Sequence, residues 1–192
     1  MTDAQLVSAL TNGDEDAFKH LVESFQDKIF SICLGYLKNE GDAEDATQEV
    51  FIELFRSIDN FKGDSALNTW IYRIAVNKSL EALRKRKTKR RFGFLNSLFG
   101  KEDVVERNHA EFKHPGIQLE NKERAEVLFR HIEKLPTNQK TAFQLHKLQE
   151  LSYQEISEVM KTSLPSVESL MFRAKKNLQK SLRDYYENDK TL

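Results

Sequence analysis

Apolar side chains recur at the three- and four-residue spacing of an amphipathic helix along almost the whole chain. The second half shows no strand-like alternation of apolar and polar residues. Gly and Pro, which interrupt helices, account for only 7 and 3 of the 192 residues. The sequence therefore predicts an all-α protein, and its length suits one large domain or two small ones.

The first half is expected to form a domain of helices over residues 1–87. The helices are expected at about residues 3–10, 14–36, 42–58 and 67–87, with Asp14 as the cap of the second and Asp42 at the start of the third. The third helix is expected to bury one broad apolar face made of Ala46, Val50, Phe51, Leu54, Phe55 and Ile58. Residues 59–65 are expected to form a loop because they are rich in Gly, Asn and Asp.

Residues 88–116 lose the helical regularity and contain Gly93, Gly100 and Pro115. We expect a flexible linker here, although residues 92–99 (FGFLNSLF) are unusually apolar for a solvated linker.

Residues 117–192 are expected to form a second, smaller helical domain. Its first helix, to about residue 134, should bury Leu128, Ile132 and Leu135, and another helix should follow at about 137–149. Ser152 and Glu155 then form a capping box that begins a short helix. A break at residues 161–163 leads to a longer helix with its core face at Val167, Met171, Ala174 and Leu178. A short helix, a tight turn and a longer helix predict a helix-turn-helix.

Charge is distributed unevenly, although the chain is neutral overall. Residues 1–80 carry 7 basic and 14 acidic side chains, whereas residues 81–113 carry 10 and 5. Within the basic segment, residues 84–91 (RKRKTKRR) have seven basic side chains in eight. This run is either a solvated helix end or a nucleic-acid contact whose affinity falls with salt. The asymmetry indicates two different partners.

Two groups of side chains have the chemistry of nucleic-acid recognition. Near the basic run, Trp70, Tyr72 and Phe61 belong either to the core or to a surface on which unpaired bases stack, with Ser65, Thr69 and Asn77 as polar groups of a base pocket. On the last helix, the face opposite the core presents Ser166, Glu168, Ser169, Phe172, Arg173 and Lys176, which is either a solvated face or a surface that contacts bases in a major groove.

Enzyme chemistry is poorly supported. Asp42, Asp45, Gln48, Glu49 and Glu53 share the exposed side of the third helix, so a carboxylate-based hydrolase is one alternative, but no His joins them at ligand spacing. The chain has no phosphate-binding glycine loop, and its single Cys, Cys33, lies in an apolar stretch and is expected to be buried. We therefore expect no catalysis, no metal, no cofactor and no small-molecule substrate.

Two long motifs resemble the extracytoplasmic-function (ECF) subfamily of RNA polymerase sigma factors. Residues 42–51 (DAEDATQEVF) and 61–77 (FKGDSALNTWIYRIAVN) resemble sigma region 2. Residues 135–136 (LP), 151–156 (LSYQEI) and 167–175 (VESLMFRAK) resemble sigma region 4. The likeness covers about residues 10–87 and 120–182 in the expected order, so the two domains would be a region 2 helical bundle and a region 4 helix-turn-helix.

The resemblance implies a role for each surface. Asp45, Gln48 and Glu49 would bind core RNA polymerase on the clamp helices of its largest subunit. The minus-ten promoter element would contact Phe61, Ser65, Thr69, Trp70, Arg73, Asn77, Arg84 and Lys85, with a flipped base captured near Phe61 and Asn77. The minus-thirty-five element would contact Ser166, Glu168, Ser169, Phe172, Arg173 and Lys176.

The resemblance also implies an anti-sigma partner that holds the protein inactive. Many relatives carry a basic residue where this chain has Glu168, and an acid there could accept a hydrogen bond from a cytosine amino group. The N-terminal sequence lacks a basic-then-apolar signal peptide and no apolar stretch is long enough to cross a bilayer, so we expect a cytoplasmic protein with no direct membrane insertion. The alternative is a stand-alone helix-turn-helix regulator, which would leave the first domain unexplained.

Overall fold

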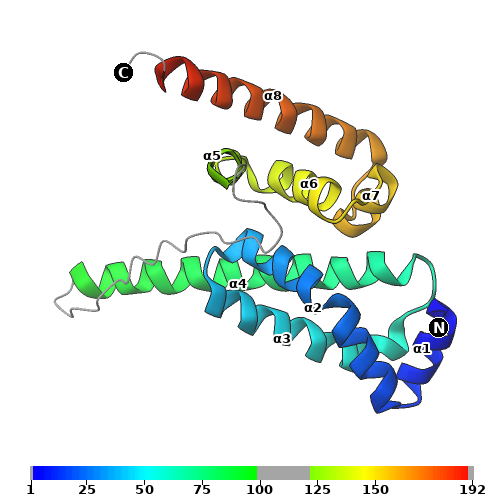
Figure 1. Ribbon diagram of the computed structural model, residues 1–192. Helices are drawn as coiled ribbons and strands as arrows, with labels where there is room; N and C mark the ends of the chain where they lie inside the picture. The colour runs from blue at the N-terminus through cyan, green and yellow to red at the C-terminus, as the bar shows by residue number, and fades with distance from the viewer. Residues whose placement is uncertain (1, 99–121, 190–192) are drawn as a thin grey trace. The chain divides into compact units, whose positions relative to one another are not determined.

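The computed structural model describes residues 2–98 and 122–189, and every regular element within these ranges is a helix (Figure 1). The chain divides into two compact units, Met1–Ala110 and Glu111–Leu192. The predicted all-α fold is confirmed. The predicted linker bounds, 88–116, stay a prediction; residues 88–98 are helical rather than irregular, and those from 99 onward lie outside the described ranges.

Local capping sets the start of the first three helices. Helix α1 (Asp3–Thr11) begins with a capping box between Thr2 and Gln5. Helix α2 (Glu15–Leu37) begins at the predicted cap, where Asp14 Oδ1 accepts a hydrogen bond from the Ala17 N–H at 3.0 Å. These side-chain oxygens satisfy N–H groups that have no partner inside the helix.

Helix α3 (Glu40–Ser57) begins earlier than the predicted start at Asp42. Asn39 Oδ1 accepts a hydrogen bond from the Asp42 N–H at 2.8 Å, so Asn39 is the cap and Asp42 already lies in the first turn. A short 3-10 helix, η1 (Ile58–Asn60), follows and leads into the loop before α4.

Helix α4 (Leu67–Leu98) is longer than predicted. We expected its end near residue 87, where the apolar pattern fades. The basic run at 84–91 spans this position, and its Lys and Arg residues have high helix propensity, so the helix continues through it.

The core of the first unit lies where α2, α3 and α4 pack on one another (Figure 1). One large apolar side chain from each helix is almost completely buried there: Ile29, Leu54 and Ile71. Cys33 is fully buried as predicted; its pKa is raised chiefly by burial, and Ser79 Oγ lies 3.4 Å from its sulfur. The buried face predicted for α3 is wrong at Phe55, which is 61% exposed. Leu54, the residue before it, faces the other helices.

The second unit contains α5 (Lys122–Glu133), α6 (Thr137–Leu148), α7 (Tyr153–Met160) and α8 (Leu164–Asp189). The predicted capping box starts α7: the Glu155 N–H donates to Ser152 Oγ and the Ser152 N–H donates to Glu155 Oε2. Lys161 then adopts a left-handed conformation with φ of 50°, which turns the chain into α8. The short helix, turn and long helix confirm the predicted helix-turn-helix geometry.

The core face of α8 is the one that the sequence predicted: Val167, Met171, Ala174 and Leu178 are all buried. The prediction for α5 is wrong at Leu128, which is 38% exposed, whereas Phe129 packs against the cluster that contains Ile132, Leu135, Ala174 and Leu178. Phe129 and Ile132 are three residues apart and share the buried side of α5, so Leu128 lies beside that side rather than on it.

We predict that Leu54→Ala and Phe55→Ala, at adjacent positions, differ sharply in their effect on stability. Leu54 is 1% exposed, so its truncation leaves a cavity and should lower the free energy of unfolding by about 2–5 kcal/mol. Phe55→Ala should cost less than about 1 kcal/mol. Trp70 is the only Trp and lies in the first unit, so urea unfolding followed by its fluorescence measures this unit. Equal losses for both variants would contradict the described packing of α3.

Candidate polymerase and promoter interfaces

The outer side of α3 is an exposed stripe that combines acidic, amide and apolar side chains. Asp45, Gln48 and Glu49 are exposed because Ala46, Val50 and Leu54 occupy the buried side. The stripe continues with Ile52, which is 43% exposed, and Phe55. We name Asp45, Gln48, Glu49, Ile52 and Phe55 the α3 outer face.

Sequence reasoning missed the apolar part of the α3 outer face. Residues 45, 48, 52 and 55 follow helical spacing, so Ile52 and Phe55 share a side with Gln48, and this spacing could have revealed them. Phe55 is not isolated, since the Phe18 ring from α2 contacts it edge-on at a centroid distance of 5.5 Å. Exposed apolar side chains beside charged ones are typical of a protein interface.

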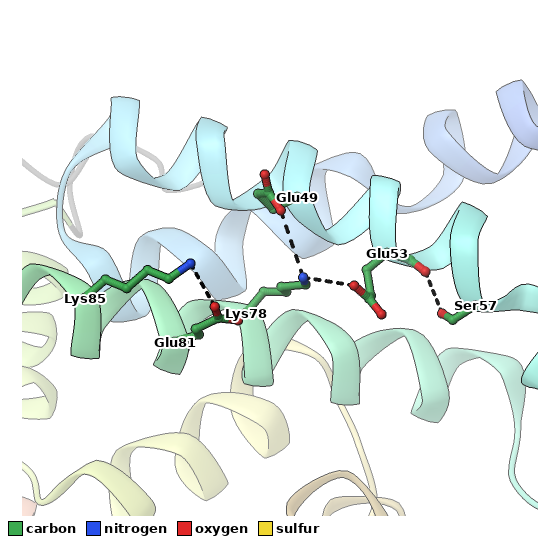
Figure 2. Close-up of polar contacts among 6 residues, drawn as sticks. All are labelled: Glu49, Glu53, Ser57, Lys78, Glu81 and Lys85. Carbon is green, nitrogen blue, oxygen red and sulfur yellow. Dashed lines mark hydrogen bonds and ion pairs between the residues drawn. The ribbon is translucent and has the colours of Figure 1, made fainter.

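Lys78 on α4 reaches across to the acidic part of the α3 outer face (Figure 2). Its Nζ lies 3.0 Å from Glu53 Oε2 and 3.9 Å from Glu49 Oε2. Further along α4, Lys85 Nζ lies 2.8 Å from Glu81 Oε1; this pair raises the pKa of Lys85 and lowers that of Glu81. Glu49 and Glu53, which the sequence places on the exposed side of this helix, are therefore both paired with Lys78.

The candidate base-capture site lies around the loop before α4. The Phe61 ring is half-buried and tilted against the Trp70 indole, with 5.3 Å between ring centroids. Trp70 and Thr69 are buried and Ser65 is half-buried, while Thr69 Oγ1 has no hydrogen-bond partner. The structure thus brings Phe61 and Trp70 together, but it places Thr69 and Trp70 in the core rather than on the surface.

The remaining predicted contacts to the minus-ten element lie along α4. Arg73, half-buried, and Asn77, exposed, are one turn apart, and Arg84 and Lys85 are exposed further along the helix. Residues 73, 77 and 84 follow helical spacing, so they share one side of α4.

The basic run contains one side chain with a clear structural role. Arg86 Nη1 donates to the carbonyl oxygen of Leu37 at 2.6 Å and lies 3.1 Å from Asp42 Oδ2. It therefore joins the C-terminal end of α2 to the first turn of α3. Among the described side chains of the run, Arg86 thus has structural contacts, whereas Arg84 is exposed.

The exposed face of α8 matches the predicted recognition surface closely. Glu168, Ser169, Arg173 and Lys176 are exposed, Ser166 is half-buried, and Phe172 is 68% exposed. Arg173 Nε donates to the Ser169 carbonyl oxygen at 3.2 Å, which holds this guanidinium along the helix in the free protein. The structure brings together all six residues predicted for the minus-thirty-five element.

Hydrogen bonds from α5 and α6 help to hold α8 on its unit. Asn177 Nδ2 donates to Gln139 Oε1 on α6 at 2.8 Å, and His131 Nδ1 on α5 lies 3.0 Å from Ser181 Oγ. His131 is buried, and burial followed by the charges of Lys134 and Arg130 lowers its pKa. These contacts fix which side of α8 faces outward.

Within residues 2–98 and 122–189, no group of three His, Cys, Asp or Glu side chains is arranged to hold a metal ion. None of the helices in the described part of the chain is long and apolar enough to cross a membrane.

Comparison with known proteins identifies the family. The Sigma-70 region 2 family matches residues 21–89, and the Sigma-70 region 4 family matches residues 119–178. The chain is 33% identical over 183 residues to the ECF RNA polymerase sigma-E factor of Escherichia coli K12, with 95% of each chain covered. It is also 33% identical over 183 residues to the RNA polymerase sigma-H factor of Pseudomonas aeruginosa, with 94% of each covered.

Solved structures share the fold. CnrH in complex with the cytosolic domain of CnrY aligns with a TM-score of 0.68 at 21% identity, covering 95% of this chain and 97% of CnrH. The sigma factor RpoE of Bartonella quintana, solved with the anti-sigma factor NepR, aligns with a TM-score of 0.64 at 19% identity, covering 86% and 96%.

A chain with both regions in this order is an RNA polymerase sigma factor, a subunit that directs promoter-specific initiation of transcription. The protein belongs to the ECF sigma factor family. The predicted family and function are confirmed, and the stand-alone regulator does not account for the region 2 match.

We predict that Arg86→Met and Arg84→Met separate the two roles of the basic run. Arg86→Met removes the contacts to Leu37 and Asp42 and should lower the free energy of unfolding of the first unit by about 1 kcal/mol. Arg84 is exposed, so Arg84→Met should leave stability within about 0.5 kcal/mol but weaken binding of the polymerase complex to promoter DNA. Urea unfolding and DNA binding at several salt concentrations measure both effects. An Arg86→Met variant with the same free energy of unfolding as the unaltered protein would contradict the structural role of Arg86.

Proposed function

We propose that the α3 outer face docks on core RNA polymerase, through the clamp helices of its largest subunit. The observation that carries this proposal is the stripe of Asp45, Gln48 and Glu49 continuing into exposed Ile52 and Phe55. Charged groups at the edge of an interface steer association and set register, while buried apolar anchors supply most of the affinity. The face offers both kinds of contact on one rigid helix.

The domain roles follow from this docking. Residues 1–87 would bind polymerase and the minus-ten element, residues 117–192 would bind the minus-thirty-five element, and residues 88–116 would link them. Capture of an unpaired base by Phe61, Asn77 and neighbouring groups would stabilise strand opening, so binding energy alone would drive melting.

Phe61 is the side chain best placed to stack on such a base. It is half-buried, with the Trp70 indole behind it, so one ring supports the other. Thr69 and Trp70 would then act by holding Phe61 and the loop rather than by broad contact with DNA. Arg73, Arg84 and Lys85 would contact the phosphates.

The protein would act without catalysis of its own, in the cytoplasm, where the polymerase works. We further propose regulation by an anti-sigma factor. The support is the fold shared with CnrH and RpoE, which were solved with CnrY and the anti-sigma factor NepR, respectively.

We predict that Asp45→Ala combined with Gln48→Ala abolishes promoter-specific transcription. Run-off transcription with purified core polymerase on genomic promoter fragments measures this directly. Both side chains are exposed, so the variant should unfold at the same urea concentration as the unaltered protein. Asp27→Ala, which removes an exposed carboxylate from α2, is the matched control and should transcribe normally. Full activity of the double variant would show that docking does not use this part of α3.

We predict that Phe172→Ala weakens use of the minus-thirty-five element without unfolding the second unit. Phe172 is 68% exposed, so truncation should change stability by less than about 0.5 kcal/mol. Loss of an apolar contact to a base should reduce affinity for a promoter by about five- to one-hundredfold. The measurement compares affinity for promoters with and without the minus-thirty-five element. Gln179→Ala, at another exposed position of α8, is the control. An equal loss on both promoters would argue against base contact by Phe172.

A further inference from the structure

Glu49 and Glu53 lie one turn apart on α3, and Lys78 on α4 stands between their carboxylates (Figure 2). Like charges at this spacing repel, so the cation stabilises the pair. Lys78 is the most covered of the three: its side chain is 23% exposed, against 40% for Glu53 and 62% for Glu49.

The two contacts are unequal. The 3.0 Å contact with Glu53 is a charge-assisted hydrogen bond, whereas the 3.9 Å contact with Glu49 is purely electrostatic. Glu53 is therefore the main counterion of Lys78. Glu49, held weakly and exposed, remains accessible to another molecule.

The consequence appears when Glu53 is removed. A cation that is mostly covered by protein is costly to leave unpaired, so Lys78 would move toward the next carboxylate. That carboxylate is Glu49, which belongs to the proposed docking surface. Glu49 would then have to break an internal ion pair before it could bind polymerase.

We infer that Glu53 is a positioning residue for polymerase docking: by pairing with Lys78, it keeps the carboxylate of Glu49 available to the polymerase. This inference rests on the proposed docking role of the α3 outer face. It assigns Glu53 a role through Lys78, with no contact between Glu53 and polymerase required.

The test measures equilibrium binding of the labelled full-length chain to core RNA polymerase, without DNA, at several salt concentrations. Glu53→Gln should weaken binding about two- to fivefold, which is the range expected for one partly exposed ion pair. Adding Lys78→Met should restore affinity, because no cation is left to occupy Glu49. Lys78→Met alone should bind at least as tightly as the unaltered chain.

Two further variants make the result specific. Asp27→Asn neutralises an exposed carboxylate on α2, away from these ion pairs, and should leave docking unchanged. Glu49→Gln should weaken binding by itself, and adding Glu53→Gln to it should cause no further loss. Urea unfolding followed by Trp70 fluorescence verifies that each variant is folded.

Several outcomes would overturn the inference. No effect of Glu53→Gln, or a loss that Lys78→Met fails to restore, means that Glu53 does not act through Lys78. If Asp45→Ala with Gln48→Ala abolishes docking while Glu53→Gln has no effect, only this inference fails. If none of these substitutions alters binding, the docking surface itself is wrong.

Discussion

The structure of the first unit depends on burial of the inner side of α3 against α2 and α4. Ala46, Val50 and Leu54 repeat at helical spacing and are almost completely buried. Once this side faces inward, the rotation of α3 about its axis is fixed, and Asp45 and Gln48 must face outward. The packing of the inner side of α3 therefore also holds the proposed docking surface in position. A disturbance of the α3 core would displace the surface as well.

Helix α4 joins the core, the docking surface and the candidate DNA contacts. Near its start, Ile71 is fully buried and Trp70 supports Phe61; further along, Lys78 reaches the acidic side chains of α3 and Arg86 joins the ends of α2 and α3. Because a single helix carries all these residues, their order along its axis is set by the helical rise. Helix α4 would thus connect the proposed docking surface on α3 with the proposed base-capture site at its own N-terminal end.

The second unit separates stability from recognition in the same way. The buried side of α8 packs on α5, α6 and α7, and the opposite side carries Phe172 and the exposed polar residues. Substitutions on the outer side would alter the proposed promoter contacts at little cost in stability. Glu168 lies on this outer side, so a substitution there would leave the fold unchanged.

The sequence by itself determined the helices, the caps of α2 and α7 and the buried side of α8, because each follows from local spacing or from side chains within a few residues, such as Ser152 and Glu155. It also determined the polar part of the α3 outer face, Asp45, Gln48 and Glu49, and the residues on the outer face of α8. Only the tertiary structure decided that Phe55 and Leu128 are exposed, since the width of a buried face depends on which helices cover it. The tertiary structure also decided the pairing of Lys78 with Glu53 and the hydrogen bond from Arg86 to the Leu37 carbonyl oxygen. These contacts join residues distant in the chain, and no local pattern specifies them.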